Sequence, residues 1–220
     1  RHGRLLSMTD PNGLVTSFGY NFRGLLLSRN AGGQQTTFTY HPTGELLRTT
    51  MPDGSWVERQ YDTAMRFTGT TDSGGHRVVY TLDSEGNRLA EQHHGPWGAT
   101  YLRRFTYDEQ NRLTHEHDSL NRLVRTYTYD LDGNRLTETP ASGAASSSTY
   151  DALGRVETRT DGANGLTRYQ YDPRDNLTRV TDPVGVATTY THDGLDNLRQ
   201  EASANSGAST FGYDSAGNLT

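Results

Sequence analysis

The sequence predicts an all-β protein built from tandem antiparallel β-hairpins. Three observations support this class: tyrosines recur about every 20 residues, Gly- and Pro-containing turn signals separate them, and no stretch sustains a 3.6-residue periodicity. Only 31% of the 220 residues are hydrophobic and 24 are glycine, so we do not expect a thick conventional core. The aromatic share of 10% argues equally against a disordered chain.

The first repeated element is a tyrosine, which in six units is followed directly by aspartate, as in Tyr61-Asp62 and Tyr171-Asp172. We predict that these tyrosines anchor successive units, since large aromatic rings pack well across neighbouring strands of a sheet. The predicted anchors are Tyr20, Tyr40, Tyr61, Tyr80, Tyr107, Tyr129, Tyr150, Tyr171, Tyr190 and Tyr213.

The second repeated element lies a few residues later and joins a turn residue to a leucine-like one. Glycine is suited to the turn because it adopts positive φ without steric cost, and leucine begins the strand that follows. The predicted leucine anchors are Leu89, Leu136, Leu177 and Leu198, and the predicted turn glycines of this element are Gly86, Gly133, Gly154 and Gly217.

The third repeated element is a tight turn, seen at Asp10–Gly13, Pro52–Gly54, Asp161–Gly165 and Asp182–Gly185. Pro-x-Gly and Asn-Gly sequences supply the fixed and positive φ angles of hairpin turns, so Gly185 is also a predicted anchor. Between the turns, segments such as Thr167–Tyr171 alternate with period two and suit a pleated strand. Each unit therefore reads turn, strand, turn, strand.

The array is expected to fill residues 1–220 with about ten such units and to be truncated at both ends. Irregular units are expected near residues 91–103, where His93–Gly98 predicts a protruding loop, and 141–148, a low-complexity flexible hairpin tip. Thr63–Phe67 lies where the other units have a sequence like Gly-Asn-Arg-Leu, and because it differs from that sequence, the register of the strands beside it is uncertain. A sheet of roughly twenty strands should curl, because open twisted sheets rarely exceed ~10 strands without doing so.

The composition excludes several kinds of chemistry. The chain has no cysteine or lysine, so it lacks a thiolate nucleophile, a disulfide, a Cys-ligated zinc site and a Schiff-base amine. The net charge of −5 argues against nucleic-acid binding. No apolar run approaches the ~18–20 residues of a membrane span. We predict no cofactor and no bound metal.

Candidate reactive groups each have a plainer interpretation. His115 and His117 share one strand face, which a metal can use, but no third ligand accompanies them. His93 and His94 beside Trp97 could form a ligand-binding loop, although a polar linker is the simpler interpretation.

Pairs of carboxylates could in principle catalyse hydrolysis, for example Asp118 with Asp130 or Asp172 with Asp182. These aspartates recur at turn positions, where Asp hydrogen-bonds its own backbone, so we interpret them as turn caps. The Ser-rich stretch near Ser146 lacks the Gly-x-Ser-x-Gly sequence of a nucleophile elbow. We therefore predict that the chain is not an enzyme.

Two interpretations remain open for the tyrosines: they could stack on sugar rings, or they could pack along the sheet as its main apolar contribution. The arginines at matching places in their units are expected to pair across strands with Asp and Glu or to stack on tyrosine faces. These arginines are Arg88, Arg112, Arg122 and Arg135.

The repeated Tyr-Asp-x-x-Gly-Asn/Arg-Leu, Thr-Asp-Pro-x-Gly and Thr-x-Tyr-x-Tyr sequences resemble the YD repeats of Rhs proteins. The segment from Tyr171 to Tyr190 is similar to a full unit of that family, and the resemblance covers essentially the whole chain. The family includes bacterial Rhs polymorphic toxins, cocoon-forming components of insecticidal toxin complexes, and animal teneurins.

The resemblance implies a hollow, spiralling β-shell that encloses a toxic C-terminal domain before delivery in competition between bacteria or attack on a host. It implies an exported, secreted or cell-surface bacterial protein. The partners implied are the remainder of the shell, the enclosed toxin domain and a component of a secretion system. The alternative is an extracellular carbohydrate-binding or adhesion array. Exposed sheet edges also predict self-association of the isolated chain.

Overall fold

The structure is a computed structural model that describes residues 3–214 and 216–220, with the side chains of 99 and 100 excepted. The described residues form strands and turns but no helix, and hence no helix that could cross a membrane. The prediction of an all-β array of tandem antiparallel hairpins is confirmed. The strands are β1 (Ser7–Thr9), β2 (Val15–Tyr20), β3 (Leu26–Ala31), β4 (Gln34–Tyr40), β5 (Leu46–Thr50), β6 (Trp56–Tyr61), β7 (Phe67–Asp72), β8 (Arg77–Leu82), β9 (Arg88–Gly95), β10 (Gly98–Tyr107), β11 (Leu113–His117), β12 (Leu123–Tyr129), β13 (Arg135–Pro140), β14 (Ser146–Tyr150), β15 (Val156–Thr160), β16 (Leu166–Tyr171), β17 (Leu177–Thr181), β18 (Ala187–His192), β19 (Leu198–Ser203) and β20 (Gly207–Thr210).

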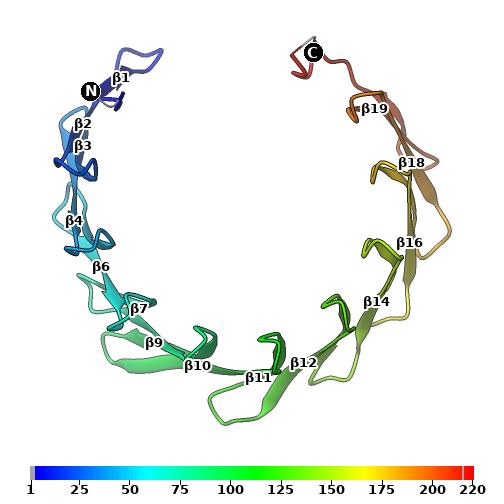
Figure 1. Ribbon diagram of the computed structural model, residues 1–220, viewed down its shortest axis with the longest axis horizontal. Helices are drawn as coiled ribbons and strands as arrows, with labels where there is room; N and C mark the ends of the chain where they lie inside the picture. The colour runs from blue at the N-terminus through cyan, green and yellow to red at the C-terminus, as the bar shows by residue number, and fades with distance from the viewer. Residues whose placement is uncertain (1–2, 215) are drawn as a thin grey trace. The chain divides into compact units, whose positions relative to one another are not determined.

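The chain divides into two compact units. The first comprises residues up to Tyr107 together with His117–Arg122, and the second comprises Asp108–Glu116 with Leu123–Thr220. Within the first unit β1 to β10 pair in chain order, and within the second β12 to β20 do the same, every pair antiparallel (Figure 1). Consecutive strands are thus neighbours, as local hairpin pairing dictates.

Successive turns lie alternately at the two ends of the strands, and we call each row of strand ends an edge. We call the edge with the turns that follow the Tyr-Asp sequences the anchor edge; its turns start at Asn21, His41, Asp62, Asp83, Asp108, Asp130, Asp151, Asp172, Asp193 and Asp214. The opposite edge carries the Asp-Pro-x-Gly type of turn, including those that start at Asp10, Asp72, Asp161 and Asp182.

A β-bulge recurs where the sheet meets the anchor edge. In the pair β16–β17, Gln170 lies opposite Arg179 while Tyr171 lies opposite Leu177, so one residue of β17 is extra. The same shift occurs in β2–β3, β4–β5, β6–β7, β8–β9, β12–β13, β14–β15 and β18–β19. A bulge bends its strand and increases the local right-handed twist. The repeat therefore adds the same bend at one edge of each unit.

The sheet is a single layer with almost no interior. Among the described residues only Gly69, Tyr127, Thr16 and Thr49 are buried, the last three at 8%, 6% and 9% exposure, and no large side chain is fully enclosed. This agrees with the expectation of a thin wall, in which each unit contributes few apolar residues and relies on its neighbours.

The irregular stretches are more ordered than the sequence predicted. His93 and His94 belong to strand β9 rather than to a loop, and β9 and β10 form one long hairpin whose tip is Pro96 and Trp97. In the stretch 141–148 the turn is short and Ser146–Ser148 already belong to β14. The register at Thr63–Phe67 is regular, because Met65 takes the positive φ (62°) that glycine supplies elsewhere.

Candidate functional site: a ladder of linked turns

The repeated chemistry of this chain lies in the anchor-edge turns, and the turn at Asp151 is representative. The Asp151 N–H donates to the Arg155 carbonyl at 2.9 Å and the Gly154 N–H donates to the Asp151 carbonyl at 3.0 Å. One carboxylate oxygen of Asp151, Oδ1, accepts the N–H groups of Leu153 and Arg155 at 2.9 and 3.0 Å. The side chain thus caps the turn through its own backbone, as the sequence analysis predicted.

The second carboxylate oxygen of each capping aspartate binds the side chain four residues later. Arg155 Nε donates to Asp151 Oδ2 at 2.7 Å, and in the Asn-type turns Asn134 Nδ2 donates to Asp130 Oδ2 at 2.9 Å. The hydrogen bond from the Arg155 side chain holds the pKa of the Asp151 carboxyl below its ordinary value. Equivalent Arg–Asp pairs occur in the anchor-edge turns at Arg66–Asp62 and Arg112–Asp108, and in an opposite-edge turn at Arg122–Asp118.

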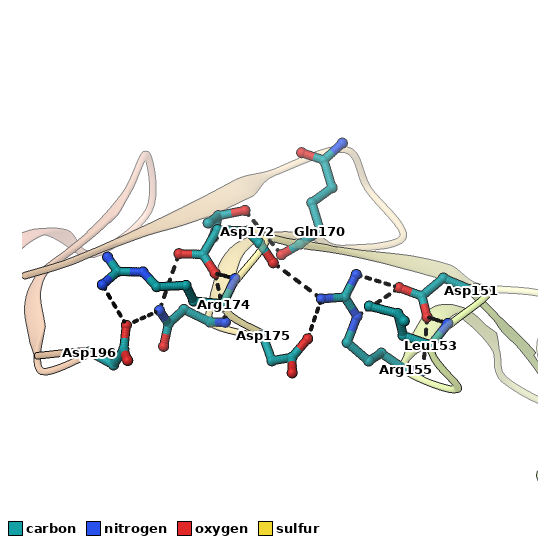
Figure 2. Close-up of polar contacts among 10 residues, drawn as sticks. Asp151, Leu153, Arg155, Gln170, Asp172, Arg174, Asp175 and Asp196 are labelled. Atoms are coloured by element: carbon teal, nitrogen blue, oxygen red, sulfur yellow. Dashed lines mark hydrogen bonds and ion pairs between the residues drawn. The ribbon is translucent and has the colours of Figure 1, made fainter. Parts of the chain in front are cut away.

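The same arginines reach forward to the next turn on the edge. Arg155 Nη1 donates to the Asp172 carbonyl at 3.2 Å and to Asp175 Oδ1 at 2.7 Å (Figure 2). Arg112 Nη1 donates to the Asp130 carbonyl at 2.8 Å, and Arg66 Nη1 donates to the Asp83 carbonyl at 2.8 Å. One guanidinium therefore closes its own turn and grips the next one, which its planar fork of donors allows.

Two aspartates provide a further link where other turns have glycine. Asp175 and Asp196 have φ of 69° and 63°, the left-handed region that normally favours glycine. Asp196 Oδ1 accepts Asn176 Nδ2 at 2.7 Å and lies 3.4 Å from Arg174 Nη1 (Figure 2). These carboxylates bind the preceding turn, a contact that glycine cannot make.

The anchor tyrosines tie each unit to the backbone of the one before it. The Tyr129 hydroxyl donates to the Leu113 carbonyl at 2.8 Å, and burial raises the pKa of that hydroxyl. The same bond is made by Tyr20, Tyr40, Tyr61, Tyr107 and Tyr150 to the carbonyls of Leu5, Leu26, Leu46, Arg88 and Arg135.

Tyr80 and Tyr190 occupy a different position in their hairpins from the other predicted anchor tyrosines. In most of the other hairpins, the anchor tyrosine is the last residue of its strand and pairs with the first residue of the next strand. In these two hairpins that position belongs to Leu82, which pairs with Arg88, and to His192, which pairs with Leu198. Tyr80 and Tyr190 lie two residues earlier. Sequence reasoning missed Leu82 and His192 because it followed tyrosine alone; both precede a capping aspartate and lie 21 residues after Tyr61 and Tyr171.

The leucine anchors also fall at two different positions. Leu177 and Leu198 lie opposite Tyr171 and His192, whereas in β9 and β13 that place belongs to Arg88 and Arg135. Leu89 and Leu136 follow one residue later, at the bulge.

Of the predicted glycines, Gly86, Gly133, Gly154 and Gly217 occupy the positive-φ position of anchor-edge turns, and Gly185 occupies that of an opposite-edge turn. The predicted anchors Tyr171 and Tyr213 lie opposite Leu177 and Leu219.

The cross-strand pairing expected of the four arginines is wrong, because each pairs with a carboxylate three or four residues away in its own turn or strand. The expected stacking on tyrosine faces is confirmed for Arg88, Arg112 and Arg135. Arg88 pairs with Glu91 at 2.9 Å and lies 3.7 Å from the centre of the Tyr80 ring. Arg112 pairs with Asp108 and lies 4.9 Å from the Tyr129 ring. Arg122 pairs with Asp118 at 2.6 Å; Arg135 pairs with Glu138 at 3.2 Å and lies 5.6 Å from the Tyr127 ring.

The candidate catalytic and metal groups form no reactive constellation in the described part of the chain. Asp172 and Asp182 cap turns at the two ends of β17, so the proposed carboxylate pair does not assemble. Asp118 and Asp130 each cap their own turn.

Among the described residues, no three His, Asp or Glu side chains lie close enough together to hold a metal ion. His115 and His117 of β11 therefore have no third metal ligand beside them in this part of the chain. His93 Nε2 lies 2.6 Å from Glu91 Oε1, and the His93 ring packs edge-on against Tyr101. Chemically, the linked turns resist displacement of one hairpin against the next, which is a mechanical property.

Known proteins share both the repeat and its fold. The RHS Repeat family matches residues 1–29, 20–55, 107–145, 129–167, 150–187 and 171–208. A double-stranded DNA deaminase toxin A from Burkholderia cenocepacia is 32% identical over 176 residues, covering 59% of this chain and 12% of that protein. The chain therefore corresponds to a small part of this relative.

Solved structures with a similar fold come from toxin complexes. The TcdB2-TccC3 structure aligns with a TM-score of 0.59 at 15% identity, and its form without the hypervariable C-terminal region with 0.58 at 16%; each alignment covers 97% of this chain and 16% of the other. The Photorhabdus luminescens Tc holotoxin pore aligns with 0.57 at 15% identity, over 97% and 15%. These identities establish similarity of fold alone. Together with the repeat matches over most of its length, they show that the chain belongs to the RHS repeat family.

Proposed function

We propose that this chain is a wall segment of an Rhs-type shell that encloses a toxic C-terminal domain until delivery. Its role is structural and non-enzymatic, and the protein that carries it is exported by a bacterium for competition with other bacteria or attack on a host. The chain spans 12% of the length of the deaminase toxin to which it is similar, and the proposal assigns the toxic activity to a domain other than this segment.

The observation that carries this proposal is the single-layer sheet with its ladder of linked turns. A protein that binds a ligand inside a core needs an interior, whereas the described residues here include almost no buried side chain. A wall instead needs each hairpin to be bonded to the next one along its length. The guanidinium links from Arg66, Arg112 and Arg155 to the following turns supply it at the anchor edge.

The partners of the segment follow from this role. We propose the remaining windings of the same shell, the enclosed toxin domain and a component of a secretion system. One fold relative, TcdB2-TccC3, also has a structure without its hypervariable C-terminal region, which supports a separation between wall and variable cargo. The carbohydrate-binding alternative gains no support from the geometry, because several tyrosine rings carry an arginine on their faces.

Protease protection in the full-length protein tests the proposal. The unaltered protein should protect its C-terminal domain from added protease, and the wall-breaking Thr158→Pro variant should expose it, since proline removes a donor from the middle of β15. Gly194→Ala, at a turn position with open space, is the matched control and should protect fully. Equal digestion of the C-terminal domain in all three proteins would overturn the proposal.

A further inference from the structure

A groove in the second unit lies between two successive anchor-edge turns, Asp130–Asn134 and Asp151–Arg155. Its volume is about 720 Å³. Three carboxylates, one aromatic ring and two leucines line it, from Asp130, Asp132, Asp151, Tyr150, Leu136 and Leu153. Both turns belong to the same unit, so the groove is a feature of one rigid stretch of hairpins.

The corresponding interval on either side is occupied by a guanidinium of the chain itself. Between the turns at Asp108 and Asp130, Arg112 donates to Asp108 Oδ2 at 2.7 Å and to the Asp130 carbonyl at 2.8 Å, with its guanidinium 4.9 Å from the Tyr129 ring. Between the turns at Asp151 and Asp172, Arg155 donates to Asp151 Oδ2 at 2.7 Å and to the Asp172 carbonyl at 3.2 Å (Figure 2). Its guanidinium lies 4.7 Å from the centre of the Tyr171 ring.

The remaining two intervals of the second unit also hold an arginine. Arg174 donates to the carbonyls of Gly194 and Asp193 at 3.1 and 3.3 Å. Arg199 donates to the Phe211 carbonyl at 3.4 Å and lies 6.0 Å from the Tyr213 ring. In the second unit, an arginine therefore lies in each of the other four intervals.

The groove lacks that occupant because residues 132 and 134 are Asp and Asn, where the intervals that follow have Arg155 or Arg174. Asn134 Nδ2 reaches Asp130 Oδ2 at 2.9 Å, and the next turn has Gly154 at the place where Asp196 accepts the equivalent Asn176. The neighbouring Arg135 is engaged elsewhere, with Glu138 at 3.2 Å and over the Tyr127 ring. Among the described residues, no guanidinium lies over the Tyr150 ring, and the Asp132 carboxylate has no hydrogen-bonding or ionic partner.

We propose that this groove binds the guanidinium of an arginine side chain supplied by another polypeptide segment. The ring of Tyr150 offers a face for cation–π contact, and Asp132 supplies the negative charge. The Asp151 carbonyl occupies the same position in its turn as the Asp130 and Asp172 carbonyls, each of which accepts a hydrogen bond from an arginine. The inference rests on the repeat geometry and does not depend on the proposed function.

The site should prefer arginine to lysine. The guanidinium fork in the occupied intervals binds a carboxylate and a carbonyl simultaneously while lying beside a ring, a geometry that a compact ammonium does not reproduce. One exposed side chain held this way binds weakly, with a Kd on the order of millimolar. Such a contact suits a segment that is already held nearby by other interactions.

Titration of the full 220-residue chain with the peptide acetyl-Gly-Arg-Gly-amide tests the site, with the amide signals of Asn134 and Gly154 followed by NMR. The expected result is saturable shifts at these two amides. The corresponding citrulline peptide, which keeps the shape and removes the charge, should bind at least tenfold more weakly, and the lysine peptide should fall between the two.

Two variants and one control locate the site. Asn134→Arg should fill the groove with the chain's own guanidinium, abolish the peptide-induced shifts and raise the melting temperature. Asp132→Asn should weaken peptide binding at least threefold without changing the turn. Asn176→Arg is the control, because its interval already contains Arg174, and it should leave peptide binding unchanged.

Several results would overturn the inference. These are equal affinity for the citrulline and arginine peptides, unchanged binding by Asn134→Arg, or unchanged binding by Asp132→Asn. If Asn134→Arg does not fold, the groove does not accept a guanidinium in the manner of its neighbours, and the inference is again overturned.

Discussion

Where an anchor-edge turn begins with aspartate, that aspartate has two functions in one carboxylate. Its Oδ1 accepts backbone N–H groups within its own turn, and its Oδ2 accepts the arginine or asparagine four residues later. Because the ionised form makes all of these bonds, the folded state favours the carboxylate over the acid. The charge state of these aspartates therefore controls how well the turns hold.

The first prediction concerns pH. The pKa of Asp108, Asp118 and Asp151 is lowered in the folded chain by hydrogen bonds from backbone and side chains of the same turns, from an ordinary value of 3.8. A lowered folded-state pKa contributes stability above the ordinary value, and that contribution is lost as the pH falls through the folded-state pKa. The urea midpoint should be constant from pH 7 to about 5 and should fall below about pH 4. A midpoint that rises on acidification would contradict this.

The second prediction concerns the tyrosine hydroxyls. Tyr129→Phe removes the bond to the Leu113 carbonyl and should lower the free energy of unfolding by about 0.5–1.5 kcal/mol. Tyr190→Phe is the matched control, because Tyr190 lies two residues before the position opposite the post-turn strand, and it should change the stability much less. Urea denaturation of both variants measures the difference. Equal losses would show that the hydroxyl bond is not what distinguishes the two positions.

At this scale the sequence predicted the chemistry well and the positions less well. Capping aspartates and paired arginines were predictable because local side-chain hydrogen bonds depend on spacing within one turn. The sequence did not show that Leu82 and His192, two residues after Tyr80 and Tyr190, lie opposite the strand that follows the turn, because the strand register depends on the bulge. The arginine links between turns were also missed, since they join residues 17 to 20 positions apart.

At the scale of the element, the turn and its adjacent bulge form the unit that repeats. The turn requires one residue with positive φ, most often glycine, and this position accepts Met65, Asp175 and Asp196 in particular units. The latter two use their carboxylates to bind the previous turn. These exceptions could not be derived from the local sequence, because their compensating contacts come from another hairpin.

The third prediction separates backbone conformation from packing. Gly133 has a φ of 91° and Gly194 has no positive φ, and a methyl group at either would meet open space. Gly133→Ala should lower the free energy of unfolding by about 1–2 kcal/mol because alanine is strained in the left-handed region. Gly194→Ala should be nearly neutral. Chemical denaturation provides the comparison, and similar losses in both variants would refute the conformational explanation.

At the scale of the whole molecule, stability comes from neighbours. In the described part of the chain, every contact between strands joins consecutive strands of the sequence. Stability in such arrays is approximately a sum of unit and nearest-neighbour contributions, so damage should remain local. A conventional core would instead spread the effect of one lesion over the entire domain.

The fourth prediction, site-resolved amide hydrogen exchange of Thr158→Pro, tests the central claim most directly. Thr158 lies opposite Thr149 of β14 and Arg168 of β16, so the substitution disrupts one hairpin and its neighbour. We predict faster exchange in β14–β17 and unchanged protection in β3–β6 of the first unit. Loss of protection throughout both units would contradict the account, because it would show one cooperative core in place of a wall of hairpins.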